Sequence, residues 1–287
     1  MQAYKEPLNE VQAHLLIGEA IRNSKPFAMG KLGGTETRAI YHTERFLQID
    51  LIYGFSWIKY GRQLLMLSGV YPLNKRTFHH FAALYKKSVL PACDFISAWQ
   101  SSKKESTLIR KFAPQARITL ELLNDFVPGS WIQHLAGKRV LVISPFSETV
   151  QRQHPKRQQI WQRVPELGVD FELLTLSCPL YSHMVPPVHS DWFVALEAMK
   201  EGMRQLDYDV LLVGAGAWGL ALAAAAKEAG KVGIHMGGNV QLLFGIKGAR
   251  WDSYPDLYNE HWVYPADSET PKGVENVEGS CYWKPNA

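Results

Sequence analysis

The segment Lys31 to Glu36, KLGGTE, places a cation, two glycines and a carboxylate next to one another. It follows the apolar run 26–32, which predicts a short strand, and it precedes a predicted helix over 35–46. Backbone N–H groups at a helix N-terminus bind anions, and glycine lets a ligand approach the backbone closely. Glu36 falls in the first turn of that helix, where an acid either takes part in chemistry or only interacts favourably with the helix dipole.

A second glycine turn, GAGAWG at 214–219, follows the apolar run 210–213. The Ala-rich segment after it predicts a helix that ends at Gly230, and the apolar run 232–236 predicts a second strand. Another glycine pair, 237–238, follows that strand. The whole unit is therefore a predicted βαβ crossover with parallel strands and a glycine turn after each strand.

The GAGAWG turn matches GxGxxG, the pattern with which dinucleotide-binding folds hold a pyrophosphate. That pattern also requires an acid about twenty residues further on, to hold a ribose hydroxyl. The sequence there reads Ile234, His235, Met236, without an acid. Three interpretations follow: NAD or FAD binding, glycines that only allow close packing of helix on strand, or another phosphate-bearing ligand at the same edge of the sheet.

A third candidate anion site lies in GKRVLVISPF, 137–146. A basic turn leads into a short apolar strand, and a predicted helix over 147–164 follows, opening with Ser147 and Glu148. Ser144 and Ser147 beside that helix N-terminus could cradle an anion, with Arg152 and Arg157 adding positive charge. The alternative is a capped helix with a solvated basic face.

The elements that must position these residues alternate along the chain. Predicted strands near 140, 173, 211 and 233 are separated by predicted helices, which is typical of an α/β fold: a Rossmann-like, doubly wound, mainly parallel sheet with helices on both faces. Further elements are a helix over 8–23 capped by Asn9, a helix over 74–90, a strand over 93–99, a helix from 190 to 205 capped by Ser190, a loop-rich wall over 51–72, and a segment of helix or strand over 116–123.

We expect a single domain over 1–287, with a soft boundary near 128–137, a Rossmann-like core over 137–250 and an aromatic tail over 251–287 that wraps the edge of the sheet. The composition, 46% hydrophobic and 20% charged, is that of an ordinary soluble protein, and a net charge of +4 does not indicate a nucleic-acid partner.

The chain has three cysteines without CxxC pairing, so neither a disulfide framework nor a zinc site is indicated. No segment is apolar enough for a signal core or a membrane span, which predicts a cytoplasmic protein without a transmembrane segment. Peripheral membrane association through basic residues stays open.

Several stretches together resemble the bacterial GT-D-type glycosyltransferases and their relatives in surface-polysaccharide gene clusters. These stretches are KLGGTE (31–36), SGVYP (68–72), GKRVLVISPF (137–146), SDWFVALEAMK (190–200), GAGAWG (214–219), IHMGGNVQLLFGIKGARWD (234–252) and EGSCYW (278–283). The resemblance spans nearly the whole chain and implies a Rossmann-like fold that binds a nucleotide-diphosphate sugar.

The resemblance also implies an Asp-x-Glu motif that assists a divalent metal (Mn or Mg) and the donor diphosphate. The matching positions are Gly34, Thr35 and Glu36, with glycine at the position of the aspartate. The loss of one carboxylate weakens a site for a hard cation. Two roles for Glu36 follow: it holds a metal together with substrate phosphates, or it is the base that accepts a proton from the acceptor hydroxyl.

The resulting prediction is a glycosyltransferase that moves a sugar from a nucleotide-diphosphate donor to a glycan or lipid-linked acceptor. The predicted donor-site residues are Lys31, Gly33, Gly34, Thr35, Ser144, Ser147, Glu148, Arg152, Arg157, Gly214, Gly216, Gly219, His235, Gly237, Gly238, Lys247 and Arg250, and the predicted acceptor-side residues are Asp191, Trp192 and Tyr258. The alternatives are a non-catalytic protein that binds nucleotide sugars or glycans within an assembly complex, and an NAD(P)- or FAD-dependent oxidoreductase.

Overall fold

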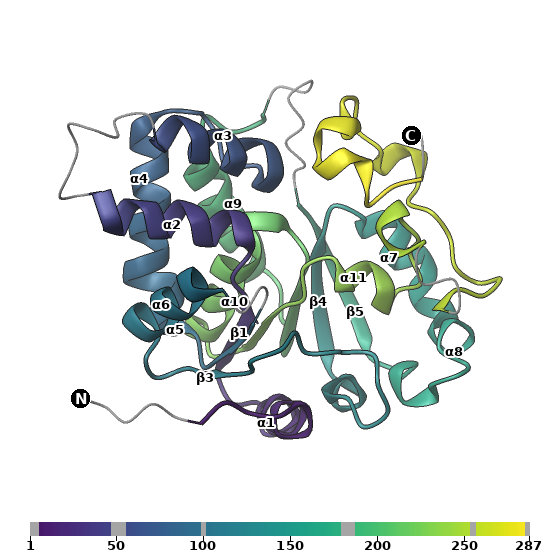
Figure 1. Ribbon diagram of the computed structural model, residues 1–287. Coiled ribbons are helices and arrows are strands. Elements are labelled where there is room, and N and C mark those ends of the chain that lie inside the picture. The colour runs from purple at the N-terminus through teal and green to yellow at the C-terminus, as the bar shows by residue number, and fades with distance from the viewer. Residues whose placement is uncertain (1–5, 47–55, 99–101, 179–186, 253–256, 285–287) are drawn as a thin grey trace.

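The centre of the protein is a seven-stranded, all-parallel sheet with the strand order β3-β2-β1-β7-β6-β4-β5, seen in a computed structural model (Figure 1). The described residues are 6–46, 56–98, 102–178, 187–252 and 257–284. The strands are β1 (Phe27–Lys31), β2 (Phe95–Ser97), β3 (Arg117–Ile118), β4 (Arg139–Ser144), β5 (Glu172–Ser177), β6 (Val210–Val213) and β7 (Val232–His235). Helices cover both faces of the sheet, which confirms the predicted doubly wound α/β fold.

The first and second halves of the chain share this sheet. β1 pairs with β7, with Phe27 opposite Val232, so strands from both sides of segment 128–137 are hydrogen-bonded neighbours. Segment 116–123, predicted as helix or strand, contains the short edge strand β3. Because all strands are parallel, their carboxyl ends meet at one edge of the sheet.

One face of the sheet carries the helices α2 (Gly34–Phe46), α3 (Ser56–Ser68), α4 (Lys75–Leu84), α5 (Leu90–Ala92), α6 (Lys103–Phe112), α9 (Trp192–Arg204) and α10 (Gly219–Glu228). Alternate side chains of the central strands, such as Leu141 and Ile143 of β4, pack into this layer. The arrangement follows from the period-2 alternation of strand side chains, which gives each face of the sheet its own apolar core.

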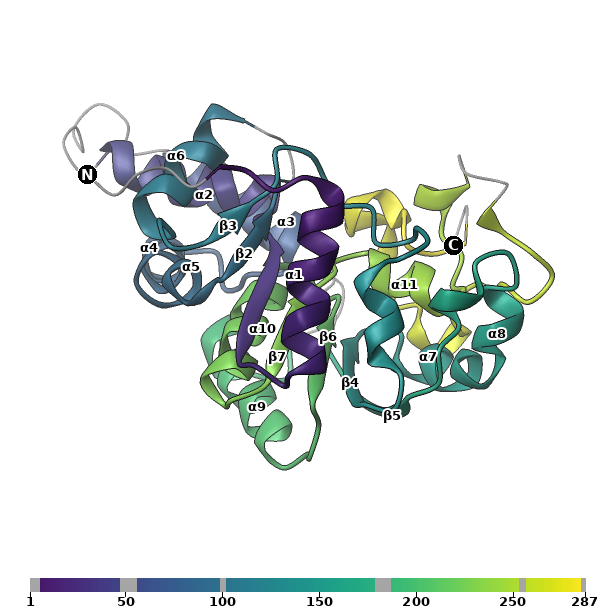
Figure 2. The ribbon, with the colours of Figure 1, turned by 90° about the horizontal axis from the view of Figure 1, so that it is seen from below.

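The opposite face carries α1 (Glu10–Arg22), α7 (Ser147–Gln153), α8 (Arg157–Ile160), α11 (Asn239–Leu243) and the 3₁₀ helix Trp131–Leu135. Val140 and Val142 of β4 point to this side. Figure 2 shows α1 lying along the sheet on this face. None of the helices in the described ranges combines the length and the apolarity needed to cross a membrane.

Capping residues explain several helix starts. Asn9 caps α1 through a reciprocal capping box with Gln12, as predicted. Asp191, and not Ser190, caps α9, because its carboxylate accepts hydrogen bonds from the N–H groups of Phe193 and Val194. The predicted helix over 74–90 divides into α4, a π-helical turn over Tyr85–Val89 and α5.

Two predictions about helices were wrong. Segment 51–72 was expected to be loop-rich, but its described part contains α3, whose side chains Trp57, Tyr60 and Leu64 pack into the first core layer. The predicted helix over 147–164 is broken after Gln153 by a 3₁₀ turn that contains Pro155, because proline cannot continue the hydrogen-bond ladder.

The tail was predicted to wrap an edge of the sheet, and its described part over 257–284 lies at the carboxyl ends of the strands. The edge strands are β3 and β5, whereas the tail lies beside α7 and α11 at the carboxyl ends of the strands (Figure 1). Its side chains Trp262, Val274 and Trp283 are buried in the second core layer. The tail is therefore part of the wall around the strand ends.

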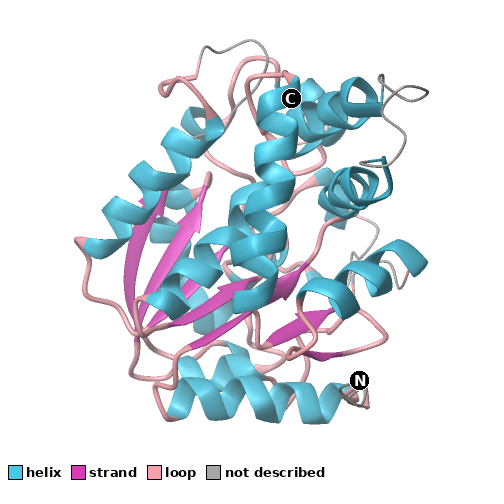
Figure 3. Ribbon diagram, turned by 90° about the vertical axis from the view of Figure 1, so that its left-hand side faces the viewer, coloured by secondary structure: helices cyan, strands magenta, loops and turns pink. Residues whose placement is uncertain are grey.

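The connections after β4 and β6 leave the sheet in opposite directions. The chain passes from β4 to α7 on one face, and from β6 to α10 on the other, and Figure 3 shows helices on both sides of the strands. Since β4 and β6 are neighbours in the sheet, a crevice forms between the two connections. Such a crevice is where open α/β sheets bind ligands.

Candidate functional site

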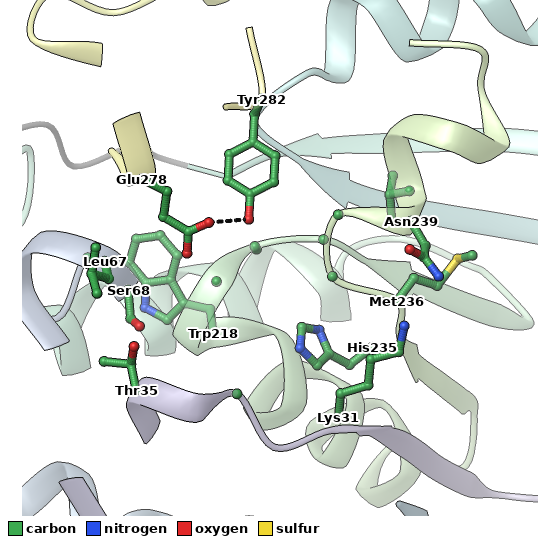
Figure 4. A pocket seen from close by; sticks show the side chains of 18 of the residues that line it. Lys31, Thr35, Leu67, Ser68, Trp218, His235, Met236, Asn239, Glu278 and Tyr282 are labelled. Atoms are coloured by element: carbon green, nitrogen blue, oxygen red, sulfur yellow. Dashed lines mark hydrogen bonds between the residues drawn. The ribbon is translucent and has the colours of Figure 1, made fainter. Parts of the chain in front are cut away.

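A cavity of about 540 Å³ opens at the carboxyl ends of β1, β7, β6 and β4. Its floor is formed by the loops after these four strands, and the end of α3 and the C-terminal tail also line it (Figure 4). The glycine turns at 33–34, 214–216 and 237–238, far apart in the sequence, all line this cavity. The structure thus brings together the turns that the sequence indicated as ligand-binding.

The predicted site residues divide into a set that lines the cavity and a set that does not. The residues that line the cavity are Lys31, Gly33, Gly34, Thr35, Glu36, Ser144, Gly214, Gly216, His235, Gly237, Gly238 and Arg250. The predicted residues outside the described lining are Ser147, Glu148, Arg152, Arg157, Gly219 and Lys247, together with the acceptor-side residues Asp191, Trp192 and Tyr258.

Glu36 lies in the first turn of α2 with only 7% of its surface exposed. Burial raises the pKa of its carboxyl group, and the charge of Glu278 acts in the same direction. Its own backbone N–H and the hydroxyl of Ser68 donate hydrogen bonds to the carboxylate, which oppose the rise without cancelling it. A side chain at Gly33 would collide with this carboxylate, so the glycine before α2 makes room for Glu36.

Lys31 ends β1 and is 5% exposed. Burial lowers the pKa of its ammonium group, while the negative charge of Asp125 favours the charged form. Asp125 is itself buried and accepts hydrogen bonds from Trp131 Nε1 at 2.9 Å and Asn239 Nδ2 at 2.8 Å. The floor therefore holds the buried cation Lys31, and two hydrogen-bond donors hold the carboxylate of Asp125 that favours its charged form.

Asp125 was missed in the sequence, because no periodic element surrounds it. Asn239 was missed as well, although the glycine pair before it marked the turn. The only available signal was its position one residue after that glycine pair, at the start of α11.

His235 explains the third glycine of GAGAWG. Its imidazole occupies the space where Gly219 would carry a side chain, and its Cβ lies 2.7 Å from the corresponding position at Gly30. Burial, followed by the charge of Lys31, lowers the pKa of His235 to about 4, and Nδ1 lies 3.3 Å from the carbonyl oxygen of Val213. Gly219 thus has a packing role against a neutral histidine, and it does not line the cavity.

The anion site expected at the start of α7 is filled by the chain itself. The carboxylate of Glu269 accepts a hydrogen bond from the N–H of Glu148 at 2.7 Å and further bonds from Thr149. A carboxylate is the kind of group that a helix N-terminus prefers. The prediction that Ser147 and Glu148 bind a ligand phosphate there was therefore wrong, and the physical reason is a tail residue 120 positions away.

The two basic residues that were predicted to add charge to this site, Arg152 and Arg157, do not line the cavity. Arg157 pairs with Asp170 and donates to the carbonyl oxygen of Val169, and Arg152 is exposed on α7. Ser144 does line the cavity, where its hydroxyl accepts a hydrogen bond from Phe146 N at 3.1 Å.

The expected acceptor-side residues have structural roles. Asp191 caps α9, and Trp192 is fully buried, with its ring stacked on Trp218 at 6.1 Å between centroids. The hydroxyl of Tyr258 donates to Asp252 at 3.2 Å, and the ammonium of Lys247 lies 5.3 Å from the Tyr258 ring. None of these side chains lines the described cavity.

Arg250, Glu278 and Tyr282 form a hydrogen-bonded cluster in the wall made by the tail, and of these only Arg250 was predicted as a site residue. The hydroxyl of Tyr282 donates to Glu278 at 2.7 Å, and Arg250 Nη1 donates to that hydroxyl at 2.8 Å. The guanidinium of Arg250 also lies 5.2 Å from the ring of Trp251. Glu278 and Tyr282 appear in Figure 4 across the cavity from Lys31 and His235.

A metal site built from protein ligands alone is not supported. Within the described ranges, His, Cys, Asp and Glu side chains form no group of three or more that could hold a metal ion. The acids among the described lining residues are Glu36 and Glu278. A divalent metal would therefore depend on substrate phosphates for most of its oxygen ligands.

Searches with this chain against protein-family models, curated proteins and solved structures found no match. The function is therefore argued from the cavity.

Proposed function

We propose that the cavity binds a nucleoside-diphosphate sugar and that the protein transfers the sugar to a hydroxyl group of an acceptor. The observation that carries the proposal is that buried Lys31 and buried Glu36 both line one cavity at the carboxyl ends of parallel strands. A cation there suits a diphosphate, and a buried carboxyl group elsewhere in the same cavity suits the hydroxyls of a sugar. The volume of about 540 Å³ is within the range of small-molecule sites.

The diphosphate would lie against the N-terminus of α2 and the turn before α10. The first N–H groups of a helix have no acceptors within the helix, and Gly34 and Gly216 allow close approach of phosphate oxygens. Lys31 would neutralise the charge that develops on the departing diphosphate. Trp251 and Tyr282, which also line the cavity, offer aromatic faces for a nucleobase.

The acceptor would enter past an apolar rim. Met66, Leu67 and Leu122 line the cavity and are 45%, 38% and 47% exposed. Exposed apolar side chains at the mouth of a polar cavity suit an acceptor that joins a sugar to an apolar part, such as a lipid-linked glycan. A transferase of this kind would work in the cytoplasm, where it meets its donor.

A non-catalytic binding protein is the second candidate. Gly34 leaves the first turn of α2 with a single carboxylate, which favours binding without turnover. The GxGxxG match at 214–219 no longer supports the oxidoreductase alternative, because Gly219 accommodates His235 and β7 ends without an acid.

The first test is a thermal-shift screen of the purified protein with UDP, GDP, CDP, CMP and NAD, each with and without manganese. Binding to the folded state stabilises it by about 2.7 kcal/mol at a ligand concentration a hundred times the dissociation constant. We expect one nucleoside diphosphate to raise the unfolding midpoint. A shift with NAD alone would reject the donor-binding proposal.

The second test measures transfer and donor hydrolysis with the sugar of the nucleotide that binds. Glu36→Ala should abolish both, whereas Glu166→Ala, which removes an exposed acid on the 3₁₀ turn Pro165–Leu167, should keep wild-type rates. Binding without turnover across candidate acceptors would favour the non-catalytic protein. Full activity of Glu36→Ala would remove Glu36 from the mechanism.

A further inference from the structure

Glu278 brings a second carboxylate into the cavity from the tail. Its side chain is 35% exposed and lies 3.7 Å from Arg250 Nη1, in addition to its hydrogen bond from Tyr282. Glu36 and Glu278 both line this cavity, and the charge of Glu278 acts in the direction that raises the pKa of Glu36. The two differ in surroundings: Glu36 is enclosed at the floor, whereas Glu278 is at the solvent side, where Tyr282 donates a hydrogen bond to it and Arg250 forms an ion pair with it.

The backbone at Glu278 is held in an unusual conformation. Glu278, Gly279 and Ser280 have φ values of +49°, +64° and +55°, in the left-handed region that non-glycine residues rarely adopt. Non-glycine residues such as Glu278 and Ser280 persist in this region where their surroundings fix them, often at functional sites.

The flanking contacts that fix this turn come from the body of the protein. Gln241 Nε2 donates to the carbonyl oxygen of Tyr282 at 2.8 Å, and Arg250 N donates to that of Cys281 at 2.7 Å. The indole of Trp283 donates to the carbonyl oxygen of Glu269 at 2.9 Å. The turn is thus anchored on both α11 and the tail, and it holds the Glu278 carboxylate at the mouth of the cavity.

We propose that Glu278 is the general base of the transfer, accepting the proton of the acceptor hydroxyl at the solvent side of the cavity. This inference rests on the proposed function. In the step, the acceptor oxygen forms a bond to the anomeric carbon as its proton passes to Glu278. The bond between the anomeric carbon and the diphosphate oxygen breaks, and the nucleoside diphosphate leaves with the electron pair towards Lys31. A single displacement of this kind inverts the anomeric configuration.

The same geometry separates the roles of the two acids. A base must meet the acceptor, which enters from the solvent side, and Glu278 lies there whereas Glu36 lies at the floor. Burial raises the pKa of Glu36, so Glu36 suits hydrogen bonding to the donor as a neutral acid. Pairs of carboxyl groups in unlike environments are the usual way in which acid and base roles are divided. Arg250 and Tyr282 are positioning residues that orient Glu278.

The test compares Glu278→Gln with Glu275→Gln, which removes an exposed acid in the same tail outside the described lining. Loss of a general base typically costs 10²–10⁴-fold in rate, so we expect Glu278→Gln to lower kcat by at least about 100-fold. The thermal shift with the nucleoside diphosphate and the unfolding midpoint should stay at their wild-type values. The rise of the wild-type rate with pH should be absent in Glu278→Gln, and the product should have inverted configuration.

Three results would overturn the role of Glu278. The first is transfer by Glu278→Gln at the wild-type rate with the wild-type pH profile. The second is recovery of that variant by high manganese, which would assign Glu278 to a metal. The third is retention of configuration in the product. If the wild-type protein binds no nucleotide and transfers no sugar, the proposed function itself fails, which these measurements separate from failure of the base.

Discussion

At the scale of single residues, the floor of the cavity contains three ionisable groups whose pKa values are shifted by burial. Burial shifts the pKa values of Glu36, Lys31 and His235 towards the neutral forms of all three groups. Desolvation disfavours a charge, whatever its sign. Functional sites collect such groups, and this supports the cavity as the site of chemistry.

Glu36 makes the stability of the protein depend on pH. Because its pKa in the folded state is raised above the ordinary value of 4.5, its contribution to stability is fully present below pH 4.5 and is lost as pH rises through the raised value. Glu36→Gln, which stays neutral, should therefore gain stability relative to the wild-type protein as pH rises from 4 to 8. Each pKa unit of the shift corresponds to about 1.4 kcal/mol.

The measurement is urea unfolding of both proteins across that pH range, with Glu166→Gln as an exposed control. A constant difference between Glu36→Gln and the wild-type protein at all pH values would contradict a raised pKa. The measurement does not depend on any ligand.

At the scale of elements, the glycine turn before α10 shows how one motif serves two purposes. Gly214 and Gly216 line the cavity, whereas Gly219 faces the imidazole of His235. Gly233 of β7 brings the strand close to the backbone of Ala223 in α10. The βαβ unit is therefore packed too closely for side chains at Gly219 and Gly233. Close packing of helix on strand thus accounts for the third glycine of the GAGAWG turn.

Gly219→Ala should destabilise the protein by about 1–3 kcal/mol, because the new methyl group overlaps the His235 ring. In a His235→Ala background the overlap is gone, and the added cost of Gly219→Ala should fall to a few tenths of a kcal/mol. A double-mutant cycle in urea measures this coupling. Additive effects of the two substitutions would show that the clash is not the cause.

At the scale of the whole molecule, the C-terminal tail contributes both to the hydrophobic core and to the wall of the cavity. It places Trp262 and Trp283 in the second core layer, and Trp283 also lines the cavity. The carboxylate of Glu269 caps α7 from the same tail. Residues 257–284 are thus part of the fold, and the cavity has no wall on that side without them.

Trp283→Ala and Trp262→Ala form a matched pair, because both remove a buried indole from the tail. Each should cost about 3–5 kcal/mol of unfolding free energy. Only Trp283→Ala should also weaken binding of the nucleotide that shifts the wild-type midpoint, since Trp262 is outside the described lining. Unfolding in urea and calorimetric titration check both statements, and equal loss of affinity in the two variants would contradict them.

Local patterns in the sequence determined much of the architecture. The apolar runs after 26, 139, 171, 210 and 232 predicted strands, and glycine turns after three of them, those after 26, 210 and 232, line the cavity. Parallel strands carry their carboxyl ends to one edge, so these turns had to meet once the strands formed one sheet. The sequence also identified Glu36 and Lys31 from their neighbours alone.

Contacts between distant segments were decided only by the tertiary structure. Glu269 fills the N-terminus of α7, the charge of Asp125 acts on buried Lys31, and Glu278 lines the same cavity as Glu36, although the residues of each pair are far apart in the sequence. Periodicity records which face of an element is apolar, and it contains no information about which other segment covers that face. Whether a helix N-terminus binds a ligand or a carboxylate of its own chain therefore depends on packing, and the same is true of the burial that shifts the pKa values at this site.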